Sequence, residues 1–136
     1  MKMLALLLFF GLAIGAHADG PADIETAERA ANEWLAFVDS EQYERSWQQG
    51  AALLKSQVAQ AQFKDAVQKA RGQFGKLQIR KRRTADLAHT LPGVPDGEYV
   101  VLRFDVMFAH KADAVETVTM VHEADRVWRA CGYFLR

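Results

Sequence analysis

The spacing of the hydrophobic residues changes near residue 75, and this change divides the chain into a helical part and a strand part. From Asp23 to Asp39 apolar side chains recur every three or four residues, as on one face of an amphipathic helix. A shorter stretch with the same spacing runs from Tyr43 to Leu54. Gly50 lies in this stretch and predicts a break, because glycine destabilises a helix interior.

A third helix is expected between residues 56 and 75. Ser56 is a suitable N-cap, and the apolar stripe that follows it ends at Gly72 or Gly75. After Gly75 the period falls from 3.6 to 2, since Leu77 and Ile79 alternate with polar residues. We therefore expect the first strand to begin at Leu77.

Three further strands are predicted after the first. Residues 98–109 alternate most clearly, with five apolar side chains on one face: Val100, Leu102, Phe104, Val106 and Phe108. Short turns lead to strands over residues 115–122 and 127–135. Leu91–Gly97 is expected to be a structured loop. Its prolines fix the backbone φ angle and its glycines free it, and an inner strand tolerates neither.

This order of elements predicts an α+β fold in one domain. Three helices precede four strands, and there is no strand-helix-strand crossover of the kind that makes a parallel sheet. We expect the three N-terminal helices to pack on a curved four-stranded antiparallel sheet, as in the cystatin-like and nuclear-transport-factor-2-like cones. Such folds usually bind ligands in a cleft between sheet and helices, but the analogy does not by itself indicate a function.

Residues 1–18 have the pattern of a cleavable signal peptide. Lys2 supplies a positive charge, Met3–Ile14 is an apolar run, and Ala16 and Ala18 are the small residues that precede a cleavage site. The alternative is a retained membrane anchor, which is less well supported because a spanning helix needs about 20 apolar residues. We expect cleavage near Ala18, a mature domain of residues 19–136, and a periplasmic or secreted protein without a stable membrane span.

Charge and cysteine content narrow the range of partners. The chain has 17 basic and 17 acidic residues, and removal of Lys2 with the signal peptide leaves a net charge of −1 with histidine neutral. A domain without net positive charge is not expected to bind nucleic acid. Cys131 is the one cysteine, so it either packs as a small buried residue, which we favour, or links two chains.

The sequence has no recognised motif for a cofactor, a metal or covalent catalysis. It lacks a phosphate-binding glycine loop, a nucleophile elbow and histidines spaced for zinc, so we expect neither a cofactor nor a metal. Glu116 and His122 share one face of a predicted strand, and such a pair can perform general acid-base catalysis. The favoured alternative is that charged residues on a sheet form cross-strand pairs that stabilise it.

Basic and aromatic residues supply candidates for ligand binding. Arg80 begins the basic run Arg80–Arg83, whose guanidinium groups suit anions, although such a run also protects an exposed edge strand from aggregation. Tyr43, Trp47 and Tyr133 combine an apolar ring with a polar tip and are candidates to line a pocket. The helical spacing of Trp47 is equally explained by core packing.

Several stretches of the chain occur together in one known family. They comprise residues 34–39, Tyr43, residues 46–47, 71–75, 91–101 and 116–119, Trp128 and residues 132–134, and they include the unusual string Pro-Gly-x-Pro-Asp-Gly-Glu-Tyr. On these residues the chain resembles the exported bacterial family called domain of unknown function 4019. The family has no established activity, so the resemblance implies export, the extent of the domain and a bacterial cell envelope. Relatives commonly carry Asp-Gly where this chain has Asp125-Arg126, and an apolar residue in place of Cys131.

Three functions remain open from the sequence. The favoured one is an exported, non-catalytic module that binds a protein or a small molecule. The second is a small-ligand carrier or a cleft enzyme, which requires Glu116, His122 and Arg80 to converge in one enclosed cavity. The third is a structural homodimer of the cell envelope, in which Cys131 can link the two chains.

Overall fold

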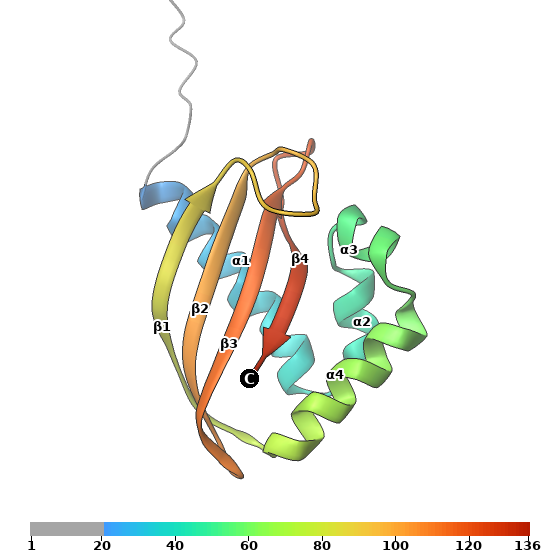
Figure 1. Ribbon diagram of the computed structural model, residues 1–136, viewed down its shortest axis with the longest axis vertical. Helices are drawn as coiled ribbons and strands as arrows, with labels where there is room; N and C mark the ends of the chain where they lie inside the picture. Colours follow the sequence, from blue (N-terminus) through green and yellow to red (C-terminus); the bar gives the residue numbers. More distant parts are fainter. Residues whose placement is uncertain (1–20) are drawn as a thin grey trace, which may run out of the picture.

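A four-stranded antiparallel sheet lies at the centre of the computed structural model, which describes residues 21–136 (Figure 1). The strands neighbour one another in chain order and are β1 (Leu77–Ala88), β2 (Tyr99–Phe108), β3 (Lys111–His122) and β4 (Trp128–Leu135). All three pairings are antiparallel, as the short connections predict. The predicted signal peptide lies outside the described residues.

Four helices, and not the predicted three, precede the sheet in residues 21–136. They are α1 (Pro21–Asp39), α2 (Tyr43–Gln48), α3 (Ala52–Gln57) and α4 (Gln60–Phe74). The second predicted stretch divides at Gly50, so the expected break is confirmed and produces two separate helices. A Cβ at Gly50 would lie 2.6 Å from Leu54 Cδ2, and the next residue, Ala51, donates its N–H to the carbonyl of Ala130 in β4 at 2.8 Å. The residues between α2 and α3 are therefore tied to the sheet, and the helix cannot continue through them.

The last helix ends as predicted but begins later than predicted. Ser56 lies inside α3, where its Oγ donates to the Leu53 carbonyl at 2.7 Å, so it does not cap α4. The N-cap of α4 is Ala59, whose side chain has no hydrogen-bond acceptor. At the other end Gly75 is the C-cap, with a φ of 77° that favours glycine.

The helices cover one face and one edge of the sheet. α1 crosses a face, and α2, α3 and α4 lie on the β4 side (Figure 1). The predicted alternation of β2 is confirmed, because all five side chains of its apolar face are at most 2% exposed. They form one core with five side chains of α1, namely Ala27, Ala31, Trp34, Leu35 and Val38.

The opposite face of the sheet carries exposed charged residues. A cross-strand ion pair joins Arg83 in β1 to Asp105 in β2 at 2.6 Å, with both side chains about half exposed. Tyr99 is an exception on this face, because it is 2% exposed and its hydroxyl donates to the Pro95 carbonyl at 2.5 Å. The predicted loop therefore folds back over the end of the strand that follows it.

Within residues 21–136, two residues other than glycine adopt the left-handed conformation. Glu41, with a φ of 63°, follows α1 in a Schellman motif, in which Gln42 N–H donates to the Phe37 carbonyl and Glu41 N–H to the Val38 carbonyl. Arg126, with a φ of 67°, closes the turn of the β3–β4 hairpin at the position that usually holds glycine. The left-handed conformation costs a residue with a side chain about 1 kcal/mol or more.

We expect Glu41→Gly and Arg126→Gly each to raise the free energy of unfolding by about 0.5–1 kcal/mol. Glycine relieves the strain of the left-handed backbone, and this gain exceeds the entropy that glycine adds to the unfolded chain. Urea unfolding of each variant beside the parent protein measures the change. A loss of stability in both variants would show that these turns are not strained in solution.

Candidate functional site

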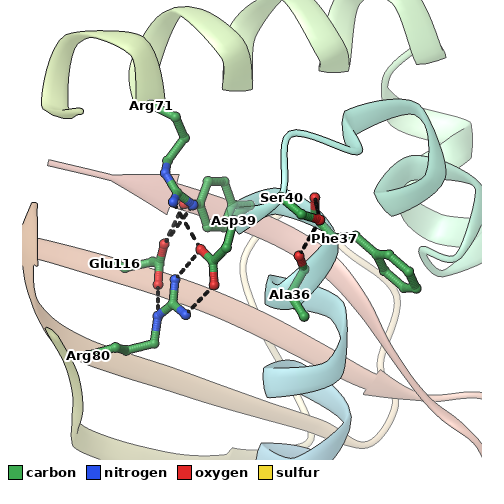
Figure 2. Close-up of polar contacts among 8 residues, drawn as sticks. Ala36, Phe37, Asp39, Ser40, Arg71, Arg80 and Glu116 are labelled. Carbon is green, nitrogen blue, oxygen red and sulfur yellow. Dashed lines mark hydrogen bonds and ion pairs between the residues drawn. The ribbon is translucent and has the colours of Figure 1, made fainter. Parts of the chain in front are cut away.

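Four charged side chains from four different elements meet beneath the helices. Asp39 ends α1, Arg71 lies in α4, Arg80 in β1 and Glu116 in β3, and Figure 2 shows both guanidinium groups directed toward the two carboxylates. Their side chains are 23%, 7%, 12% and 0% exposed, in the same order. We call these four residues, together with Tyr133 of β4, the buried charge cluster.

Each of these charged residues takes a position that the local pattern assigns to the core. Asp39 continues the buried helical row Ala27, Ala31 and Leu35, and Arg71 continues the buried row Phe63 and Val67. Glu116 lies between Ala114 and Val118, which are both buried on the same face of β3. Arg80 is paired across the sheet with Val106, so it faces the same core.

The cluster is held by short, charge-assisted hydrogen bonds. Arg80 donates from Nη1 and Nη2 to the two oxygens of Asp39 at 2.8 and 2.9 Å, and from Nε to Glu116 Oε1 at 2.7 Å. Arg71 Nη2 donates to Asp39 Oδ1 at 2.9 Å, and its Nη1 lies 3.9 Å from Glu116 Oε2. The hydroxyl of Tyr133 donates to Glu116 Oε2 at 2.5 Å. All four carboxylate oxygens therefore accept a hydrogen bond.

Two positive and two negative groups make the cluster neutral at pH 7. Burial by itself raises the pKa of Asp39, but the hydrogen bonds and charge of Arg80, together with Arg71, hold that pKa below its ordinary value of 3.8. Burial and the nearby carboxylate of Glu116 raise the pKa of Tyr133, so its hydroxyl stays a neutral donor. The balanced charge and the bonded carboxylate oxygens favour a structural role over proton transfer, and among the described residues Arg71 Nη1 is the buried atom of the cluster that has no hydrogen-bond partner.

The other catalytic candidate, His122, does not join Glu116. Its Nδ1 lies 2.7 Å from Glu98 Oε2, and its ring stacks on Trp128 with centroids 4.7 Å apart. His122 lies six positions after Glu116 along β3, which corresponds to about 20 Å of strand. The structure therefore brings Arg80 and Glu116 together but places the histidine at the far end of the strand.

The four ligand-binding candidates also divide between two places. Arg80 and Tyr133 meet on Glu116 in the buried charge cluster. Tyr43 is 6% exposed in the core, and Trp47 packs against that core and donates its Nε1–H to the Val58 carbonyl at 2.9 Å. The two α2 residues thus serve helix packing in this structure.

Sequence reasoning missed Asp39 and Arg71, although the chain carried a signal for both. A charged residue at the next position of a buried helical row indicates a buried ion pair, because an unpaired charge is too costly there. The rows that end at Asp39 and at Arg71 follow this rule. The identity of their partners was not visible, since Asp39 is 32 residues from Arg71 and 41 residues from Arg80 along the chain.

A second site lies on the surface between α1 and the β3–β4 hairpin. It is a groove of about 420 Å³ with an apolar lining that includes Trp34, Met120 and Trp128. Its polar lining comes from six residues, Thr26, Arg29, Glu33, Gln49, Arg126 and Arg129. We call it the α1-hairpin groove, and its volume falls within the usual range for small-molecule pockets.

The arginines of the groove differ from those of the buried charge cluster. Arg129 is bound to Glu123 and Asp125, with N–O distances of 2.8 Å to each. The side chains of Arg29 and Arg126 make no ion pair or hydrogen bond with any residue in the described part of the chain. Two exposed guanidinium groups therefore remain available at an aromatic groove.

Comparison with protein families matches residues 30–133 to the model of one family, described as a protein of unknown function (DUF4019). All five residues of the buried charge cluster lie within this range. Searches of curated proteins and of solved structures found no match. Within residues 21–136, no helix has the length and hydropathy needed to cross a bilayer, and no group of histidine, cysteine or carboxylate side chains is placed to hold a metal.

We expect Glu116→Gln to lower the free energy of unfolding by about 3–5 kcal/mol, because it leaves the buried Arg80 without one of its two anions. Glu44→Gln is the matched control, since it removes an ion pair of similar length, 2.6 Å to Lys64, that is about half exposed. The control should cost less than about 1 kcal/mol. Chemical unfolding measures both values, and equal losses would mean that the buried charge cluster is solvated.

Stability should also fall in acid through Asp39. Because its folded pKa lies below the unfolded value of about 3.9, its ion pairs contribute stability above about pH 4 that is lost as the pH falls through the folded pKa. Asp39→Asn should therefore be less stable at neutral pH and lose less stability between pH 4 and pH 2. Urea unfolding across this range measures both slopes, and identical slopes would contradict the assignment.

Proposed function

The chain belongs to the DUF4019 family of proteins of unknown function, and we propose that it acts as an exported, non-catalytic binding module of the bacterial periplasm. The observation that supports binding is the α1-hairpin groove, in which unpaired guanidinium groups lie beside tryptophan side chains. The signal-peptide pattern of residues 1–18 supports export.

The buried charge cluster and the α1-hairpin groove differ in whether their charged side chains already have partners within the protein. In the buried charge cluster every carboxylate oxygen already accepts a hydrogen bond from the protein. In the α1-hairpin groove Arg29 and Arg126 have no partner among the described residues. A ligand would therefore gain more from the groove, where it does not compete with existing ion pairs.

The finer fold assignment remains part of the proposal. We propose that the sheet and α1 form a cystatin-like or nuclear-transport-factor-2-like cone. An antiparallel sheet in chain order with a long helix across one face supports it. The α1-hairpin groove then lies between the sheet and the helical layer, where such folds usually bind ligands.

The other functions receive less support from the geometry. The cleft-enzyme hypothesis required Glu116, His122 and Arg80 in one cavity, and His122 lies about 20 Å of strand away from Glu116. A disulfide-linked homodimer would need a reactive thiol, but Cys131 is 7% exposed and burial raises its pKa to about 12. A carrier of small ligands is compatible with the groove and is a form of binding module.

Native mass spectrometry of the protein purified from its own cell envelope tests the proposal. We expect a chain that begins at Asp19 and carries an additional bound mass. Ala30→Phe, which places a large ring in the lining of the groove, should lose that mass while circular dichroism shows the fold retained. A bare monomer in every preparation, or a mass that Ala30→Phe retains, would count against a binding function at this groove.

A further inference from the structure

We infer that the α1-hairpin groove binds an amphipathic monocarboxylate, a molecule with an apolar body and one terminal carboxylate. This inference rests on the binding function proposed above and adds the chemical class of the ligand. It is drawn from the charges, the aromatic lining and the backbone conformation of the groove.

The unpaired guanidinium groups of the groove favour an anion. Three arginines and one glutamate line it, and Arg129 is already bound by both Glu123 and Asp125. The lining groups without a charged partner are then Arg29, Arg126 and Glu33, and these six charged groups together are neutral. A single carboxylate adds only one charge to these surroundings, and its two oxygens fit the paired N–H groups of a guanidinium.

The apolar lining favours a ligand with a hydrophobic body. Trp34 and Trp128 are 4% and 6% exposed, and they lie beside Met120, Ala30 and Ala130. The Nε1–H of Trp34 donates to the Ser46 carbonyl at 2.7 Å, so this indole offers a ligand no free hydrogen-bond donor. A volume of about 420 Å³ leaves room for an acyl chain or a ring system but not for a folded partner.

Arg126 gives an independent argument from the backbone. It holds the left-handed position of the hairpin turn, where glycine would be unstrained, and its side chain lines the groove. Backbone strain of this kind is concentrated at binding sites, where a side chain that contacts a ligand offsets its cost. Contact with the carboxylate of a ligand fits Arg126, because the guanidinium has no partner in the described part of the protein.

Tryptophan fluorescence and calorimetry of the purified protein can test this with defined probes. Two of the three tryptophans in the chain line the groove, so a ligand there should change the emission. We expect dodecanoate, below its micelle concentration, to bind with one-to-one stoichiometry and to change the emission. The two control probes are acetate, which has the charge without the chain, and dodecyltrimethylammonium, which has the chain with the opposite charge. Each should bind at least about tenfold more weakly than dodecanoate, because a charge-assisted hydrogen bond is worth about a factor of ten or more.

Variants assign the effect to the two arginines. Arg29→Gln and Arg126→Gly should each weaken dodecanoate binding about tenfold. Glu41→Gly is the matched control, because it relieves the same left-handed strain at a position that does not line the groove. We expect Arg126→Gly to melt at a higher temperature and yet bind more weakly, a combination that loss of folding cannot produce.

The outcomes separate this inference from the function on which it rests. Dodecanoate binding that is unchanged in both arginine variants, or equal binding of the cationic probe, would overturn the choice of a carboxylate. If the envelope-purified protein still carries a bound mass that Ala30→Phe removes, the binding function would stand with another ligand class. Absence of both dodecanoate binding and any retained mass would overturn both.

Discussion

The fully buried carboxylate of Glu116 is the constraint that most of this structure must satisfy. A buried charge is tolerated only when it is paired and hydrogen-bonded, and Glu116 obtains its bonds from Arg80 in β1 and Tyr133 in β4. Arg80 in turn needs a second anion, which Asp39 supplies at the end of α1. Because these partners belong to different elements, correct pairing fixes how the end of α1 lies over the sheet, and Arg71 does the same for α4.

Asp39 shows how strong this requirement is. A carboxylate at the C-terminal end of a helix is unfavourable, since the helix dipole places partial negative charge there. The same helix ends in a Schellman motif that requires Glu41 in a left-handed conformation, another local cost. Arg71 and Arg80 offset the unfavourable position of the Asp39 carboxylate. The left-handed conformation of Glu41 is kept because the chain must leave α1 at this point to reach α2.

The position of α1 also determines the α1-hairpin groove. The C-terminal end of the helix is anchored by Asp39, and residues one to three turns earlier, among them Arg29 and Glu33, line the groove opposite the β3–β4 hairpin. Charges of similar chemistry therefore have different roles in the two places. Those of the buried charge cluster pair with one another and hold elements together, whereas Arg29 and Arg126 face solvent at the groove and can receive an anion from outside.

The sequence by itself determined that helices precede four strands, because a helix and a strand each impose a spacing that local side chains reveal, but it indicated three helices where four form. It predicted the buried face of β2, the break at Gly50 and the individual interest of Arg80, Glu116 and Tyr133. Only the tertiary structure decided that these three meet, that Asp39 and Arg71 complete the cluster, and that His122 lies elsewhere. The α1-hairpin groove was also decided only by the tertiary structure, since α1 and the hairpin that form it are separated by most of the chain. Periodicity specifies which face a residue occupies, but the packing of distant elements decides what that face meets.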